Sequence, residues 1–246
     1  MKKLWAIVGR EWRAYFLSPL AYVILAAFLL MNGFIFAVIV NFLNSPQAPK
    51  GQALVLLFTN TYFWIFNLFV VPIIAMRLFA EERKSGTLEI LLTSPVSEGT
   101  VVFGKFLGAL GFFLTLWLPT LVYVAILRWQ TPIDLGPVAS AYLAVALLGG
   151  YFLSVGIFAS TLTKNQIVAA IFAFALLIVI FSGGLLQSAV NDPKLRDLFG
   201  YFNLWEHMED FARGVVDTRR VVYYLSATAF FLLVTSVSVS AKKEKP

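Results

Sequence analysis

The feature that most constrains this chain is a series of six long apolar runs separated by short polar breaks. About 20 apolar residues in a helix cross the roughly 30 Å hydrocarbon core of a bilayer. Inside lipid the backbone has no water to bond, so such runs must be helical. The sequence therefore predicts an all-α integral membrane protein with six transmembrane helices. The runs cover residues 20–40, 53–76, 102–127, 138–161, 167–187 and 221–240.

Composition supports a single transmembrane domain over residues 1–246. The chain is 60% hydrophobic and 13% charged, whereas about a quarter of a soluble domain is charged. The spans leave no room for a sizeable soluble domain. The net charge of +6 comes from basic residues that flank the apolar runs, so membrane lipid is a better counterpart than nucleic acid. The absence of cysteine excludes disulfides, thiolate nucleophiles and cysteine metal sites.

Three segments outside the spans also have sequence patterns that predict structure. Residues 1–17 repeat apolar side chains three and four apart, which predicts an amphipathic helix in the membrane interface. Ser18 and Pro19 then read as an N-cap and a first-turn proline. Residues 82–95 predict a short cytoplasmic helix, and residues 188–220 form an outer segment before the last span. Pro72 and Pro119 lie inside spans and should kink them.

The basic residues are unequally divided between the two sides of the predicted bundle. Twelve of the nineteen lysines and arginines fall in the amino terminus, at the second and fourth connections, and in the carboxyl tail. Positive charge is retained on the cytoplasmic side of membrane proteins. We therefore expect both termini to be cytoplasmic.

No ionisable residue lies at the centre of a span, which disfavours a proton-driven transporter. The polar residues Asn60, Asn67 and Gln187 are expected to bond from helix to helix. If the bundle moves cargo, its energy must enter from outside the bilayer. Gly104 and Gly108 form a GxxxG motif, which allows close helix packing but does not indicate which helix packs against it. The letters GTVVFGK, residues 99–105, lack the rest of a phosphate-binding loop.

The second connection has the pattern of a docking device. Paired acids and paired bases at residues 81–84 precede Ser85 and Gly86, which we expect to open a short helix. In that helix Leu88, Leu91 and Leu92 share one face, and Pro95 ends it. Such a helix can seat in a partner's groove or lie on the lipid headgroups, and the pattern alone does not separate the two.

The same stretch resembles the ABC type-2 permease family, in which a segment of the form EERxxGTLExLLxSP links the second and third of six spans. The resemblance implies that this segment is a coupling helix on a separate ATPase subunit, with Glu82, Arg83 and Glu89 among its contacts. ATP and Mg would be bound by that partner, and no cofactor by this chain. The matching residues, and our predicted ATPase-docking residues, are Glu81, Glu82, Arg83, Gly86, Thr87, Leu88, Glu89, Leu91, Leu92, Ser94 and Pro95.

The outer segment resembles the gliding-motility type of ABC permease, where HxxDFxxGVxDxRxVxYY precedes the final span. Its local pattern predicts a short helical hairpin in the outer headgroup layer, with aromatics that form an interfacial belt or touch substrate. A single histidine among acids suggests a solvated residue rather than a metal site. The candidate residues of this segment are Trp205, His207, Asp210, Phe211, Gly214 and Asp217.

Together these patterns predict the permease subunit of an ATP-driven ABC exporter in the bacterial cytoplasmic membrane. It would form a dimer with itself or with a related permease, and it would not be an enzyme. One alternative stays open: a membrane scaffold or anchor for an ATPase in a motility or envelope-assembly machine. An intramembrane enzyme and a gated channel fit less well, because the spans offer neither converging polar groups nor a ring of charges. The substrate is not readable.

Overall fold

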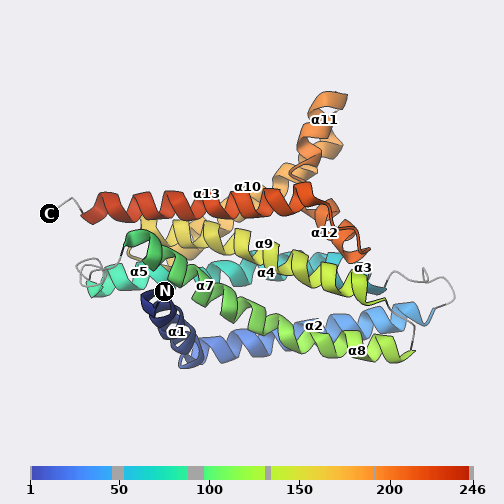
Figure 1. Ribbon diagram of the computed structural model, residues 1–246. Coiled ribbons are helices and arrows are strands. Elements are labelled where there is room, and N and C mark those ends of the chain that lie inside the picture. Colours follow the sequence, from blue (N-terminus) through green and yellow to red (C-terminus); the bar gives the residue numbers. More distant parts are fainter. Residues whose placement is uncertain (1, 46–52, 88–96, 131–133, 191, 244–246) are drawn as a thin grey trace.

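The computed structural model describes residues 2–45, 53–87, 97–130, 134–190 and 192–243, and within these ranges every regular element is a helix. Most of the helices run along one axis as an elongated bundle (Figure 1). The predicted all-α membrane fold is confirmed, since six helical stretches are long and apolar enough to cross a bilayer. They are Pro19–Leu43, Ala53–Ser85, Glu98–Trp129, Leu135–Leu162, Gln166–Gly184 and Thr218–Ala241.

The first helix, α1 (Lys2–Phe16), is amphipathic, as its pattern predicts. Ile7, Glu11 and Tyr15 are buried, one helical turn apart, while Trp5 on the other side is exposed. The helix is steeply inclined to the bundle axis, the direction expected for a helix in the membrane plane (Figure 1). Ser18 has the extended backbone of an N-cap before α2 (Pro19–Leu43), but its side chain makes no capping bond.

The second span consists of three consecutive helices, α3 (Ala53–Thr59), α4 (Thr61–Ala75) and α5 (Arg77–Ser85). The first break follows from Asn60, whose side chain accepts a hydrogen bond from the Phe63 amide at 2.8 Å and caps α4. Pro72 lies within α4, and a turn at Met76 follows it. The span therefore continues as helix through residues 77–85, which the sequence had placed in a polar connection.

The third span is interrupted at Pro119, where a kink was predicted. Helix α7 (Glu98–Trp117) leads into a 3₁₀ turn (Leu118–Thr120) that contains this proline, and α8 (Leu121–Gln130) continues. Proline has no amide hydrogen, so it cannot extend the ladder of hydrogen bonds. The interruption is local, since α8 follows the 3₁₀ turn directly.

The fourth span, α9 (Leu135–Leu162), is the core of the bundle, with 78% of its most apolar window buried. It packs against α4, α7, α10 (Gln166–Ala189) and α13 (Thr218–Lys243). Glycine permits this density: a Cβ at Gly149 would lie 2.1 Å from the Phe113 ring, and one at Gly156 would lie 2.6 Å from Ala75. Small residues let transmembrane helices approach closely.

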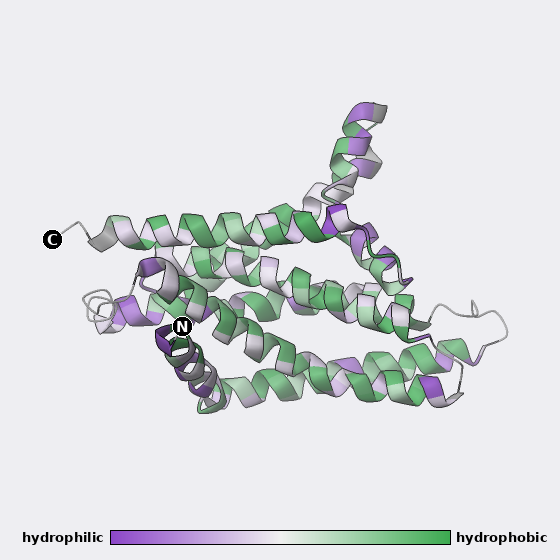
Figure 2. Cartoon of the chain, viewed as in Figure 1, coloured by the Kyte–Doolittle hydropathy of each residue, from purple (hydrophilic) through white to green (hydrophobic). Residues whose placement is uncertain are grey.

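The outer segment holds two short helices, α11 (Pro193–Gly200) and α12 (Leu204–Ala212). Helix α12 packs on α3 and α9, whereas α11 packs on α10 and extends away from the bundle (Figure 1). The two helices therefore diverge and do not form the compact hairpin that the pattern predicted. Apolar residues cover the middle of the bundle, and hydrophilic ones gather in α1 and α5 at one end and in α11 and α12 at the other (Figure 2).

Candidate functional site

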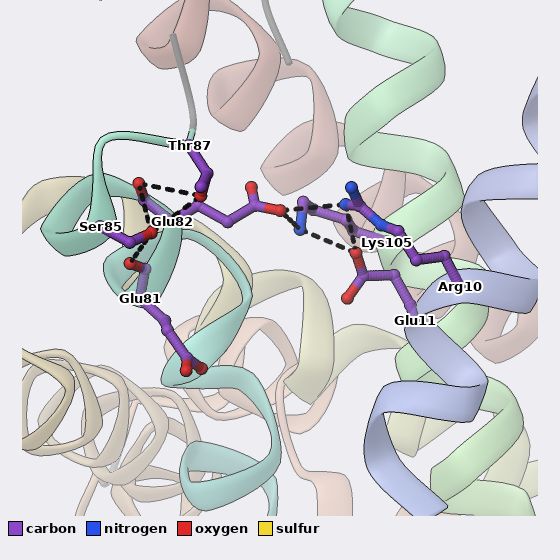
Figure 3. A network of polar contacts seen from close by, with 7 residues as sticks. All are labelled: Arg10, Glu11, Glu81, Glu82, Ser85, Thr87 and Lys105. Carbon is purple, nitrogen blue, oxygen red and sulfur yellow. Dashed lines mark hydrogen bonds and ion pairs between the residues drawn. The ribbon is translucent and has the colours of Figure 1, made fainter. Parts of the chain in front are cut away.

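Four charged side chains meet where α1, α5 and α7 converge (Figure 3). Arg10 and Glu11 come from α1, Glu82 from α5 and Lys105 from α7. We call these four residues the charge cluster. They join the interface helix, the end of the second span and the start of the third span, which are far apart in the sequence.

The bonds of the charge cluster centre on one oxygen of each carboxylate. Lys105 Nζ lies 3.0 Å from Glu11 Oε1 and 2.8 Å from Glu82 Oε1. Arg10 Nη2 lies 2.7 Å from Glu11 Oε1 and 3.0 Å from Glu82 Oε1. The side chain of Lys105 is 1% exposed. Two cations and two anions balance each other, which offsets the cost of removing Lys105 from water.

Close packing of α1 on α7 brings the cluster together. A Cβ at Gly104 would lie 2.8 Å from Ile7 Cγ2, and a Cβ at Gly108 would lie 2.7 Å from Glu11 Cβ. The GxxxG to which the sequence assigned no partner is therefore the surface on which α1 rests. Lys105 follows Gly104 directly, so the contact between α1 and α7 also brings its ammonium group next to the Glu11 carboxylate.

The groups of the cluster on α1 are held in their charged forms. Burial is the largest influence on Glu11 and acts to raise its pKa, but the charge of Lys105 and hydrogen bonds from Arg10 and Lys105 outweigh it, and the pKa is lowered. Burial acts to lower the pKa of Arg10, but hydrogen bonds and charges from Glu11 and Glu82 outweigh it, and the pKa is raised. Arg10 and Glu11 therefore remain charged at neutral pH.

A cavity of about 510 Å³ adjoins the cluster between α1 and α5. Arg77 lines it and stacks over the Tyr15 ring at 4.2 Å. Among the described residues neither Arg77 Nη2 nor Glu82 Oε2 has a hydrogen-bond partner, although both atoms are buried. Burial of an unpaired polar atom is costly, so polar partner atoms would be stabilised here.

The family described as ABC-2 family transporter protein matches residues 5–241. The chain belongs to this family. It is therefore an ABC permease subunit, a multi-pass membrane component of a transporter that is not itself catalytic. A comparison with curated proteins finds no match. The family match extends to the whole permease and does not single out the gliding-motility subtype that the outer segment resembles.

The described docking residues of the permease turn largely toward their own chain. Glu82 faces the charge cluster, and Arg83 Nη1 donates to the Thr161 carbonyl at 2.7 Å, near the end of α9. Glu81 is exposed. Thr87 Oγ1 lies 2.8 Å from the hydroxyl of Ser85.

Gly86 is the C-cap of α5 and is followed by a helical residue, Thr87, whereas we expected Ser85 and Gly86 together to open a helix. The φ of Gly86, 73°, lies in the left-handed region, which is typical of the glycine after a helix. Residues 82–85 therefore belong to α5 and not to a separate coupling helix. The remaining predicted docking residues lie outside the described residues: Leu88, Glu89, Leu91, Leu92, Ser94 and Pro95.

The polar residues of the spans serve mainly their own helices. Asn60 caps α4, and Asn67 Nδ2 donates to the Phe63 carbonyl one turn earlier, at 2.7 Å. Asn60 also donates to the Leu56 and Leu57 carbonyls of α3, but both helices belong to the second span. The predicted bonds from one span to another were wrong for these two. Gln187 fits the prediction, since its Oε1 accepts a hydrogen bond from Asn203 Nδ2 of the outer segment at 2.7 Å.

The outer-segment residues of the permease are packed rather than solvated. His207 is 3% exposed, so its predicted contact with water was wrong. Trp205 stacks on Trp64 with ring centroids 5.7 Å apart, and Phe211 is fully buried. Asp210 pairs with Arg220.

Two further predicted residues of this segment shape its chain path. Asp217 Oδ1 accepts a hydrogen bond from the Arg219 amide at 2.9 Å, at the start of α13. Gly214 has a φ of 90°, which a residue with a side chain rarely adopts. In the described part of the chain no group of three or more His, Asp or Glu side chains could hold a metal ion.

Sequence reasoning missed the charge cluster itself. The sequence argument placed Glu11 and Arg10 away from the apolar face of the first helix and gave Lys105 no role beyond its positive charge. A signal was present, because Glu11 lies on the apolar stripe of α1 between Ile7 and Tyr15, and Lys105 lies between the two glycines of the GxxxG. A charged residue on a packing face requires a partner of opposite charge.

Proposed function

We propose that this permease is the membrane subunit of an ATP-driven exporter, and that a separate ATPase subunit docks on the segment from Glu81 to Pro95. The observation that carries the proposal is the charge cluster. It ties three helices together beside the end of α5, which forms the first part of the proposed docking segment. A force on that segment would therefore reach the bundle through residues that are already bonded to it.

Two bonds give this force separate paths. Glu82 connects α5 to α1 and α7 through Lys105. Arg83 connects α5 to the end of α9, the most buried span, through the Thr161 carbonyl. Charge-assisted hydrogen bonds are short and directional, so α5 cannot tilt without moving its neighbours or breaking these bonds. Such an arrangement couples docking to span movement without an ionisable relay in the centre of the bilayer.

The exporter would act as a dimer. In α2 and α10, the first and fifth spans, 28% and 22% of the most apolar window is buried within the chain. Phe34 and Ile171 are 68% and 61% exposed. Lipid can cover such faces, but the resemblance to type-2 permeases implies that the first and fifth spans line the dimer interface. Their exposed apolar faces supply a surface for this interface, and the choice of these two spans rests on the resemblance, because the sixth span is only 11% buried.

The test separates docking from coupling in a purified complex of the permease with its ATPase subunit. Glu81→Lys with Glu89→Lys reverses charge on the docking segment and leaves the cluster intact. We expect it to abolish co-purification of the ATPase. Lys105→Met should retain the ATPase but remove the effect of the permease on ATP hydrolysis in liposomes, because the cluster is broken.

Two results would contradict the proposal. Unchanged co-purification with Glu81→Lys and Glu89→Lys would reject the docking surface. Unchanged coupling with Lys105→Met would reject transmission through the cluster. Lys164→Met is the matched control, since Lys164 is an exposed lysine outside both the cluster and the docking segment and carries the same substitution.

A further inference from the structure

Two cavities adjoin at the α12 end of the bundle, opposite the charge cluster. The first, of about 340 Å³, is lined by charged and polar side chains that include His207, Arg219 and Asp197. The second, of about 580 Å³, lies between α10 and α13 and is lined by aliphatic and aromatic side chains. Tyr223 lines both cavities. A polar site and an apolar site thus share one wall.

The polar cavity contains groups that the chain leaves unused. His207 is 3% exposed, yet its Nδ1 has no hydrogen-bond partner among the described residues. Its ring is held between Tyr223 and Tyr224, with centroids 5.6 and 5.7 Å away. A buried polar atom without a partner is destabilising. A ligand atom that bonds His207 would remove this cost.

The charges of the polar cavity fit a headgroup that carries both signs. Arg220 is held by Asp210 and by the Glu206 carbonyl. The exposed guanidinium of Arg219 makes no bond within the described part of the chain, so its N–H groups can donate to a phosphate. Asp197 and Asp217 line the same cavity and would repel a purely anionic ligand. A protonated amine beside the phosphate would form ion pairs with these two carboxylates.

The apolar cavity fits an acyl chain. Phe199 and Phe202 of the outer segment lie over it, and Ile180 and Phe230 belong to two membrane spans. Gly183 also lines it, and a Cβ there would have only ordinary contact with Phe202, at 3.8 Å. An apolar groove along two spans is surrounded by hydrocarbon in the membrane. The acyl chain of a membrane lipid is therefore the apolar ligand available to this groove.

We propose that these cavities form one binding site for a phospholipid whose headgroup carries a phosphate and an amine, as in phosphatidylethanolamine. The phosphate lies by Arg219 and His207, the amine by Asp197 and Asp217, and one acyl chain in the groove. Tyr223 lies where headgroup and chain meet. The site is independent of ATPase docking, because it lies at the other end of the bundle from the charge cluster.

Native mass spectrometry of the purified permease tests this site with phosphatidylethanolamine and phosphatidylglycerol of identical acyl chains. We expect one molecule of phosphatidylethanolamine per chain, bound about tenfold more tightly than phosphatidylglycerol, which has no amine. Arg219→Gln should weaken phosphatidylethanolamine about tenfold. Gly183→Leu should do the same by filling the groove. Excess glycerophosphoethanolamine, which has no acyl chains, should not displace the lipid.

Two control variants lie outside both cavities. Arg213→Gln changes a neighbouring exposed arginine, and Val237→Leu enlarges a side chain of α13 that is 68% exposed. Both should bind phosphatidylethanolamine as the unchanged protein does. Equal binding of the two lipids, together with no effect of Arg219→Gln and Gly183→Leu, would mean annular contact only and would overturn the proposal. Displacement by the chainless headgroup would overturn the role of the groove.

Discussion

At the scale of single residues, Lys105 is the most informative side chain of the permease. It is buried, and its ammonium group bonds to two carboxylates from different helices. Its ammonium group also lies over the Phe79 ring, with Nζ 5.3 Å from the ring centroid. Lysine tolerates such a place only when its charge is balanced. The cluster is therefore stable as a unit and unstable when any one member is removed.

Lys105→Met should destabilise the permease by roughly 3 kcal/mol, because the two buried carboxylates would keep only one of their two shared cations, Arg10. The apparent melting temperature in detergent measures the change. Lys84→Met, at an exposed position, should leave that temperature unaltered. If Lys105→Met and Lys84→Met have the same melting temperature, the cluster contributes nothing to stability.

His207 gives the permease a dependence on pH that other groups do not mask. It is the single histidine of the chain, and burial, followed by the charge of Arg220, lowers its pKa from 6.5 to about 4. Between pH 6.5 and 4 the unfolded chain therefore binds a proton at His207 that the folded chain does not. The contribution of His207 to stability is fully present above pH 6.5 and is lost as the pH falls from 6.5 to 4. Glu11, with its lowered pKa, loses stability only below 4.5.

We expect the free energy of unfolding to fall by about 3 kcal/mol from pH 6.5 to pH 4, as a shift of 2.5 pKa units implies. Melting temperatures across this range report it. His207→Gln should flatten the profile in that window while leaving the fall below pH 4.5. An unchanged profile in the variant would show that His207 is already protonated or solvated in the folded permease.

At the scale of elements, most helices could be predicted and their contacts could not. The six apolar runs and the stripe of α1 are local patterns, and all appear as helices. The breaks were harder to predict. Asn60 interrupts a long, mostly apolar run because its short amide can cap α4, and no periodicity in the sequence marks this position. Glu82 and Arg83 turn inward because of contacts with α7 and α9, which are distant in sequence.

The contact between α1 and α7 can be tested with two glycines on one helix. Gly108→Ala places a Cβ 2.7 Å from Glu11 Cβ, whereas Gly111→Ala meets only Trp12 at 3.6 Å. Overpacking costs about 1 to 3 kcal/mol, and alanine favours a helix over glycine by up to about 1 kcal/mol. Gly108→Ala should therefore destabilise the permease and Gly111→Ala should not.

Melting temperatures compare these two variants, and a cross-link confirms the cause. The chain has no cysteine, so Ile7→Cys with Gly104→Cys introduces the only possible disulfide. We expect Gly108→Ala to reduce its formation and Gly111→Ala to leave it unchanged. Equal cross-linking in both backgrounds would mean that α1 does not depend on the glycine surface for its position.

At the scale of the whole molecule, the two ends of the bundle differ in character. The six spans bring α1, α5 and the end of α13 to one end, and α11 and α12 to the other (Figure 1). The first end holds the charge cluster, and it is the side to which the sequence assigned twelve of the nineteen lysines and arginines. Its charge predicts a cytoplasmic position, and the proposed ATPase, which uses cytoplasmic ATP, requires the same side.

Labelling of single cysteines in the cysteine-free chain decides this orientation. Ser85→Cys lies at the exposed end of α5, and Thr218→Cys at the exposed start of α13, at the opposite end of the bundle. A membrane-impermeant maleimide should label Thr218→Cys in intact spheroplasts, and Ser85→Cys only in inverted vesicles. The reverse pattern would place the docking segment away from cytoplasmic ATP, and an ATPase could not drive the permease from there. Because the spans are even in number, a single orientation of these two sites also fixes both termini.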